Sequence, residues 1–305
     1  MADRNLLQYT FITLKGMAMG IAELVPGVSG GTIAFVAGIY EEFISTINNA
    51  SLKTLKLLSK EGFNSFWQQL NGNFLLALLL GMAISILSFT KLIRWLLENE
   101  PIPLWSFFFG LVIASVIFVA KAIKKWSIAT LFLFTLGAVV AYYITSLPPS
   151  QNTESLPFIF FSGAIAICAM ILPGISGSFI LVLLGTYKTV IDAIDEKDFK
   201  ILVTMAIGML FGILSFAKLL KWMFKKHKNI TLAILTGFIL GSLNKIWPWK
   251  VVLDTKTIGE KIIPIKEQNV SPFNYDGEPQ LMFAIIAAII GFSLIFILEK
   301  VASEK

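Results

Sequence analysis

The chain has 305 residues, of which 56% are hydrophobic and 14% are charged, and its formal net charge is +6. The mean hydropathy of +0.78 and several apolar stretches near the roughly 20 residues that span a bilayer indicate a polytopic membrane protein and exclude a soluble globular domain. The positive charge does not indicate nucleic-acid binding, because the lysines lie in short loops between apolar segments, as the positive-inside rule expects.

The first apolar run is interrupted by a Pro-Gly break. The segment "ELVPGVSGGTIAFVAGIY", which begins at Glu23, places a proline, glycines and a serine where a helix would otherwise continue. We expect a hairpin of two helices, at residues 5–25 and 28–47. Residues 51–70 then have apolar residues near helical spacing and lysines on the other face, which predicts an interfacial helix. Three longer helices are expected next, at residues 73–97, 101–121 and 126–146.

The second half begins with the same kind of interruption. The segment "MILPGISGSFILVLLGTY" starts at Met170 and has its proline, glycines and serine at the same spacing. We expect a second hairpin of two helices, at residues 157–172 and 175–194. Three longer helices should follow, at residues 198–224, 230–249 and 280–300, and residues 250–279 are expected to form a long, irregular extracytoplasmic loop.

Matching residues at a constant spacing predict an internal repeat. Around the breaks the pairs are Pro26/Pro173, Gly27/Gly174, Ser29/Ser176, Gly30/Gly177, Gly38/Gly185 and Tyr40/Tyr187. Five helical segments per half is an odd number, so the second half must begin on the opposite side of the membrane. The expected fold is an all-α polytopic membrane protein of two inverted-topology repeats, each a re-entrant-like helical hairpin broken at Pro-Gly plus three transmembrane helices. The predicted repeats are residues 1–147 (hairpin 5–47, helices 73–146) and 148–305 (hairpin 157–194, helices 198–300).

The lysine distribution supports opposite orientations of the two halves. The loop "ENEPIP" of the first half has no lysine or arginine, whereas its counterpart in the second half, "KKHKN", is strongly basic. The central loop "SLPPSQNTESLP" has none either, while the loops on the other side contain Lys53, Lys56, Lys60, Lys121, Lys124 and Lys125. The positive-inside rule then places both termini in the cytoplasm and residues 250–279 outside.

The two Pro-Gly breaks predict a binding site for an anion. Irregular backbone deep in a bilayer persists only against protein or a water-filled cavity, because unpaired amides and carbonyls are costly in hydrocarbon. Each break begins a new helix whose first amides have no intrahelical partner, beside glycines and serines that leave room for a ligand. Two breaks at equivalent places favour a shared midplane site over simple kinks. The predicted phosphate-binding residues are Pro26, Gly27, Val28, Ser29, Gly30, Gly31, Thr32, Pro173, Gly174, Ile175, Ser176, Gly177 and Ser178.

Three charged residues in apolar surroundings are further candidates. Lys91 and Lys218 occupy equivalent positions in the matching segments "GMAISILSFTKLIRWL" and "GMLFGILSFAKLLKWM". The sequence leaves two interpretations open: they bind the phosphate from opposite membrane faces, or they extend to the interface from helix ends. Glu23 has no acidic counterpart, since Met170 stands at the matching position. It is a candidate for proton coupling or for accepting hydrogen bonds from the amides of the break.

At these residues the sequence resembles the polyprenyl-phosphate transporter family of bacterial and archaeal membrane proteins. The segments "ELVPGVSGGTIAFVAGIYEEFI" and "AMILPGISGSFILVLLGTY" are similar to its two signature segments, and the similarity extends over essentially the whole chain. The resemblance implies a multi-pass protein of the cytoplasmic membrane that translocates undecaprenyl phosphate, the lipid carrier of cell-wall precursors, from the outer to the cytoplasmic leaflet. It also implies that residues 26–32 and 173–178 bind the phosphate.

Two alternative functions compete with this one. A membrane-embedded undecaprenyl pyrophosphate phosphatase also uses Pro-Gly-x-Ser loops, but its chemistry needs an arginine beside the loop serine and clustered glutamates. Here Gly30 and Gly177 follow the serines, and Glu23 is the only acid near either loop. The second alternative is a transporter of a small anion. We expect a transporter rather than an enzyme, with no metal or other cofactor, because Cys168 and His227 are the only cysteine and histidine.

Overall fold

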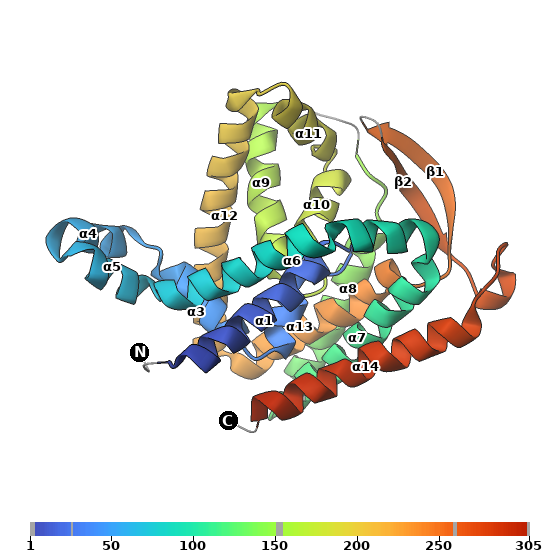
Figure 1. Cartoon of the computed structure of the whole chain (residues 1–305), viewed down its shortest axis with the longest axis horizontal. Coiled ribbons are helices and arrows are strands. Elements are labelled where there is room, and N and C mark those ends of the chain that lie inside the picture. The colour runs from blue at the N-terminus through green and yellow to red at the C-terminus, as the bar shows by residue number, and fades with distance from the viewer. Residues whose placement is uncertain (1–3, 26, 151–154, 259–260, 304–305) are drawn as a thin grey trace.

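The computed structural model describes residues 4–25, 27–150, 155–258 and 261–303, most of them helical (Figure 1). The first half contains α1 (Leu6–Glu23), α2 (Gly30–Val36), α3 (Tyr40–Asn49), α4 (Leu52–Lys60), α5 (Gly62–Leu70), α6 (Gly72–Asn99), α7 (Pro101–Lys121) and α8 (Ile128–Ser146). The second half contains α9 (Leu156–Ile171), α10 (Gly177–Leu183), α11 (Tyr187–Asp195), α12 (Phe199–Lys226), α13 (Lys228–Gly241), η1 (Ser242–Ile246), β1 (Lys250–Ile258), β2 (Lys261–Asn269), η2 (Pro272–Asn274) and α14 (Leu281–Ser303).

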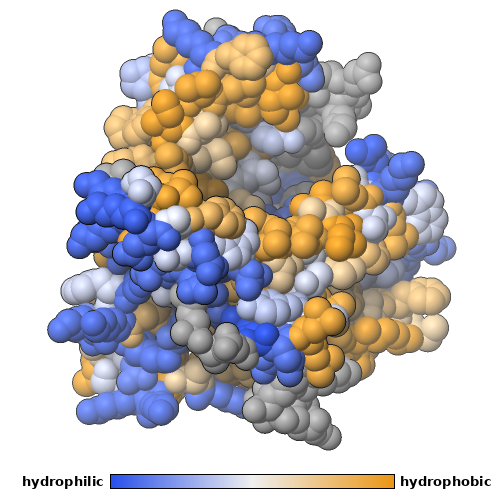
Figure 2. Space-filling model, turned by 60° about the vertical axis from the view of Figure 1, so that its left-hand side comes forward, coloured by the Kyte–Doolittle hydropathy of each residue, from blue (hydrophilic) through white to orange (hydrophobic). Residues whose placement is uncertain are grey.

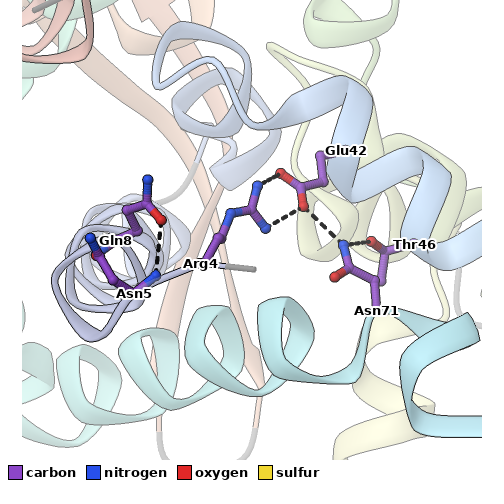
Figure 3. A network of polar contacts seen from close by, with 6 residues as sticks. All are labelled: Arg4, Asn5, Gln8, Glu42, Thr46 and Asn71. Atoms are coloured by element: carbon purple, nitrogen blue, oxygen red, sulfur yellow. Dashed lines mark hydrogen bonds and ion pairs between the residues drawn. The ribbon is translucent and has the colours of Figure 1, made fainter. Parts of the chain in front are cut away.

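A polar network fixes the start of α1 (Figure 3). The Asn5 side chain accepts a hydrogen bond from the amide of Gln8, and the Gln8 side chain accepts one from the amide of Asn5, each at 3.0 Å. Arg4 donates two hydrogen bonds of 2.7 Å to the carboxylate of Glu42 on α3. Asn71, next to α6, donates to the same carboxylate at 2.9 Å. The network therefore ties α1 to α3 and α6 at the end of α1 that is remote from the Pro-Gly break.

The long helices pack in equivalent pairs in the two halves. α1 packs along α6, and its counterpart α9 packs along α12. α7 packs along α14, and α8 packs along α13. Each of these two pairs joins one helix of the first half to one helix of the second half. Glycines permit this closeness: a Cβ at Gly81 would lie 2.0 Å from the backbone oxygen of Thr13, and one at Gly208 would lie 2.1 Å from that of Phe160. Matching glycines therefore occupy matching helix contacts.

Among the described residues, five helical segments are long and apolar enough to cross a membrane: α6, α7, α8, α12, and α13 together with η1. A sixth span is obtained if α10 and α11, which are bent by 104° relative to each other, count as one. Figure 2 shows hydrophobic side chains over the upper part and across the middle of one face, and hydrophilic side chains gathered at its lower left. These features agree with the predicted polytopic membrane protein, and the inverted orientation of its halves stays a prediction.

The second arm of each hairpin differs from the prediction of a single helix over residues 28–47 or 175–194. Each arm consists of two short helices, α2 and α3 in the first half and α10 and α11 in the second. The arms bend at the matching residues Gly38 and Gly185, which both have φ +71°, a left-handed conformation that glycine adopts without steric cost. The additional break is thus a repeated feature of the fold.

The predicted interfacial helix over residues 51–70 is also divided. It forms α4 and α5, which meet at Gly62, where φ is +84°. The exposed side chains of Leu55, Leu58 and Phe63 lie on these two helices. The segment is therefore helical but divided at its glycine, and its position at the membrane interface stays a prediction.

The prediction of an irregular loop over residues 250–279 is wrong. β1 and β2 form an antiparallel hairpin that begins at the pair Lys250 and Asn269 and includes a register shift near Asp254. Valines, threonines and isoleucines in this stretch favour strands over irregular structure. The preceding helix, predicted over 230–249, ends at Gly241 and continues as the 3-10 turn η1 to Ile246, where the helical segment stops because Pro248 favours an extended Trp247. In Figure 1 this hairpin lies on the side of the molecule opposite the two termini.

Candidate functional site

The two Pro-Gly breaks, more than a hundred residues apart in sequence, are in direct contact. The Ser29 hydroxyl lies 3.2 Å from the carbonyl oxygen of Leu172 and 3.4 Å from that of Met170, to which it donates. The amide of Gly174 donates to the Thr32 hydroxyl at 2.9 Å. Tyr40, after the bend of the first hairpin, donates its hydroxyl hydrogen to the carbonyl of Ile171 at 3.2 Å. The expectation that the two hairpin tips meet is confirmed by these contacts.

Three backbone amides at the tips, two of them at the start of α2, donate hydrogen bonds to side chains. The amide of Gly30 donates to Oε1 of Glu23 at 2.8 Å, and that of Gly31 donates to Oγ of Ser29 at 3.1 Å. The third is the amide of Gly174, which donates to Thr32 across the contact between the tips. The first tip therefore satisfies part of its own backbone through side chains, including the hydrogen bond to Glu23 that the sequence offered as one possibility.

Close packing explains the glycines at the contact between the tips. A Cβ at Gly31 would lie 2.5 Å from the carbonyl oxygen of Ile171 in the other hairpin. Gly27 and Gly174 have φ +84° and +91°, the left-handed region in which other residues are strained. These glycines fix the turn of each tip and permit the backbones to approach.

The predicted tip residues lie mostly in the protein interior. Ser29 and Thr32 are 1% exposed and Ser176 is 4% exposed, whereas the side chain of Ser178 reaches the surface of a cavity. The hydroxyls of Ser176 and Ser178 are 2.8 Å apart and share a hydrogen bond. Val28, Gly30, Gly31, Pro173, Gly174, Ile175 and Gly177 are buried, and Pro26 lies outside the described residues. Phosphate binding by these residues stays a prediction.

Lys91 and Lys218 do not lie at the tips. Both side chains are exposed, on α6 and α12 respectively. Within the described part of the chain, neither forms a hydrogen bond or an ion pair. Their predicted role in binding phosphate would therefore require them to act from the outer surface of these helices, and it stays a prediction.

A cavity of about 680 Å³ adjoins the tips and was not predicted from the sequence. Its walls come from the end of α8, residues 147–149, α10, η1 and both strands of the β-hairpin. Gly27 of the first tip and Ser178 of the second line it, together with Lys245, Lys250 and Glu267. The cavity therefore connects both tips to a group of charged side chains.

The charged side chains of the cavity form a cluster with one negative and two positive groups. Nζ of Lys245 donates to a Glu267 oxygen at 2.9 Å, and Nζ of Lys250 lies 3.9 Å from the same oxygen. Nζ of Lys250 also donates to the Lys245 carbonyl at 2.6 Å and lies 4.1 Å from the centre of the Trp105 ring. Burial lowers the pKa of Lys250 to about 8, against the opposing effect of Glu267. Burial disfavours the charge of Glu267, but Lys250 and Lys245 hold the pKa of Glu267 below its usual range.

The sequence contains only a weak signal for this cluster. The stretch from Lys245 to Pro279 has five lysines and five acids. Its length and mixed charge indicated an exposed loop, and no periodicity distinguished the lysines that face the tips. The strand pairing that brings Lys250 near Glu267 depends on the register of the β-hairpin, which a single sequence does not specify.

The hydrogen bond from Gly30 to Glu23 gives a testable role to this acid. We expect Glu23→Gln to retain transport, because the amide oxygen can accept the same hydrogen bond from Gly30. We expect Glu23→Leu to lose transport, because the buried amide then has no acceptor, at a cost of about 1–3 kcal/mol. Both variants are to be compared in purified, reconstituted protein. Loss of transport in the glutamine variant, with normal folding, would instead support proton coupling through Glu23.

Comparisons with known proteins place the chain in a family. Residues 19–262 match the family described as undecaprenyl phosphate translocase-like. The chain is 41% identical over 304 residues to a polyprenyl-phosphate transporter of Vibrio cholerae, covering 98% of each chain. It is 34% identical over 253 residues to a polyprenyl-phosphate transporter of Staphylococcus aureus, covering 77% of this chain and 85% of the relative. No solved structure matches the chain.

These matches decide between the classes of function that the sequence left open. Both relatives are named as transporters and neither as an enzyme, which agrees with the predicted transporter. Together with the apolar helices they identify a multi-pass membrane protein. The predicted family is confirmed: the chain belongs to the undecaprenyl phosphate translocase-like family of polyprenyl-phosphate transporters.

Proposed function

We propose that the protein translocates undecaprenyl phosphate from the outer to the cytoplasmic leaflet of the cytoplasmic membrane, so that the carrier lipid is reused in cell-envelope synthesis. The phosphate is held where the two hairpin tips meet, and the lipid chain stays in the bilayer. The observation that carries this proposal is the direct contact between Ser29 and Thr32 of one tip and residues 170–174 of the other. Polar groups contributed by both hairpins near the middle of the bilayer are what a charged lipid head group needs on its way across the membrane.

The physical problem that such a protein solves is the cost of moving a phosphate through hydrocarbon. An ionised group without partners is strongly disfavoured there, so it needs polar contacts along the whole path. The cavity beside the tips offers hydroxyls, such as that of Ser178, and ammonium groups, while its apolar wall includes Phe179 and Val182. The phosphate head group of a lipid can contact the polar groups of the cavity while its hydrocarbon tail contacts the apolar wall.

The proposed orientation places both termini in the cytoplasm. The basic turn at Lys226–Lys228, between α12 and α13, then faces the cytoplasm, as the positive-inside rule expects. The β-hairpin lies on the opposite side from the termini in Figure 1, so this orientation places the hairpin, whose strands line the cationic cavity, on the outer side. Rocking of the two inverted halves against each other would expose the tips alternately to the two sides.

The experiment that tests the proposal is reconstitution of the purified protein into liposomes with leaflet-specific measurement of undecaprenyl phosphate. We expect the protein to accelerate movement of the lipid phosphate between leaflets and to release no inorganic phosphate from undecaprenyl pyrophosphate. Phosphate release would favour the phosphatase alternative. If the lipid phosphate does not move between leaflets, and soluble phosphate fully prevents its binding to the protein, a transporter of a small anion would be favoured. Liposomes without protein give the background rate.

A further inference from the structure

The cluster of Lys245, Lys250 and Glu267 has an excess of one positive charge in a partly buried place. A single carboxylate lies between two ammonium groups, at 2.9 Å from Lys245 and 3.9 Å from Lys250. The side chain of Lys250 is only 8% exposed, so its charge is poorly screened by solvent. Such an arrangement attracts a second anion more strongly than a neutral ion pair would.

The two lysines differ in how firmly they are held. Lys250 donates to the Lys245 carbonyl and lies against the face of Trp105, so its ammonium group is fixed. Lys245 has 24% of its side chain exposed, and besides Glu267 its ammonium group has a ring contact with Phe179 at 5.3 Å. It can therefore move within the cavity at a smaller cost than Lys250.

Lys245 also lies directly beside the first hairpin tip. A Cβ at Gly27 would lie 2.9 Å from Cγ of Lys245, so the lysine chain passes over the turn of the tip. Ser178 of the second tip lines the same cavity. An anion bound between Lys245 and Lys250 would thus lie in the same cavity as both tips, without contact with the buried hydroxyls of Ser29 and Thr32.

We propose that Lys245 and Lys250 form a binding site for a phosphomonoester that is separate from the hairpin tips. Without ligand the Glu267 carboxylate pairs with the two lysines, and the phosphate displaces it on binding. This inference rests on the proposed function for its biological ligand, since a lipid phosphate from the outer leaflet would bind here before it reaches the tips. The exchange keeps the lysines paired at each stage. Neither the buried charge of Lys250 nor that of the arriving phosphate is left without a partner.

The volume of the cavity and its lining fit a head group with the first part of its chain. The 680 Å³ lie within the range of small-molecule sites. Tyr142, Tyr187 and Asn269, which have hydrogen-bonding side chains, also line the cavity. Phosphate oxygens accept hydrogen bonds from such donors, and charge-assisted bonds from lysines are the strongest of them.

The test compares two substitutions that should act in opposite directions. Lys245→Met removes a cation and should weaken binding of farnesyl phosphate to the purified full-length protein about tenfold. Glu267→Gln removes the competing anion at nearly constant size and should strengthen binding several-fold. Lys200→Met and Asp276→Asn, two exposed positions outside the cavity, are the charge-matched controls and should leave binding unchanged. Binding is measured by calorimetry in detergent, with thermal unfolding as a check on the fold.

Two further ligands distinguish the contribution of the phosphate group to binding from that of the lipid tail. Farnesol, which lacks the phosphate, should not respond to either substitution, and an equal response to farnesol would overturn the proposal. Inorganic phosphate should show the same opposite shifts at lower affinity if the natural ligand is a lipid, and at equal affinity if it is free phosphate. Either result supports the anion site.

The outcome can be separated from that of the proposed function. If both substitutions leave farnesyl phosphate binding unchanged, or shift it in the same direction, the exchange site is wrong even where the wild-type protein transports lipid. If the opposite shifts are found in a protein that moves no undecaprenyl phosphate between leaflets, the site stands and the transport proposal fails.

Discussion

Replacing Ser29 or Ser176 by leucine is expected to abolish translocation of the lipid phosphate while the protein remains in the membrane. Ser29 is 1% exposed, and its hydroxyl bonds to carbonyls of the other hairpin. Leucine removes that bond and adds bulk at the contact between the tips, which costs about 1–3 kcal/mol in a well-packed interior. A change of that size corresponds to roughly 5- to 150-fold in a conformational or binding equilibrium. The measurement is the leaflet-specific assay in liposomes.

Two exposed serines provide matched controls for this result. Ser88 on α6 and Ser215 on α12 are equivalent positions of the repeat, and both side chains are exposed. Ser88→Leu and Ser215→Leu introduce the same side chain away from the tips and should transport normally. Full activity of both Ser29→Leu and Ser176→Leu would remove the tips from the mechanism, whereas equal losses in all four variants would indicate a general effect on the membrane helices.

The second large effect is expected at two matching glycines between helices. A Cβ at Gly110 of α7 would lie 2.0 Å from the carbonyl oxygen of Ala288 in α14, and one at Gly237 of α13 would lie 2.1 Å from that of Phe134 in α8. Valine at either position must push the two helix backbones apart, with a destabilisation of about 1–3 kcal/mol. We expect both variants to unfold at lower temperature in detergent, as followed by size-exclusion of heated samples.

The comparison of these glycines also tests the internal repeat. Gly110→Val and Gly237→Val should destabilise the protein to a similar extent, because each lies at the crossing between a helix of one half and a helix of the other. Ala83→Val, at an exposed position of α6, is the control and should leave the unfolding temperature unchanged. A large loss of stability at one glycine and none at the other would show that the two crossings are not equivalent.

The breaks and the long helices were predictable from sequence because their signals are local. Proline and glycine interrupt an apolar run regardless of what packs against it, and the apolar length of α6 or α12 depends on composition alone. The meeting of the tips was predictable only through the repeat. The hydrogen bonds that join them, such as that from Gly174 to Thr32, depend on the tertiary structure.

The features that were missed depend on contacts between distant residues. Gly38 and Gly185 matched in the repeat, but a glycine inside an apolar pattern is often tolerated in a helix, so the bend was not predicted. The β-hairpin brings Glu267 back to Lys245, more than twenty residues earlier, and only the strand register places it there. The hydrogen bond from Gly30 to Glu23 was one of the possibilities stated for Glu23 and is observed, whereas proton coupling by Glu23 stays a prediction.

The bends at Gly38 and Gly185 keep the helix that follows each tip short. α2 and α10 each have seven residues, which rise roughly 10 Å at about 1.5 Å per residue, against about 30 Å for the hydrocarbon core. Neither segment alone is therefore long enough to cross that core. A charge held at a tip is thus separated from the far end of the helix that follows it by about 10 Å of helix rather than by a full membrane span.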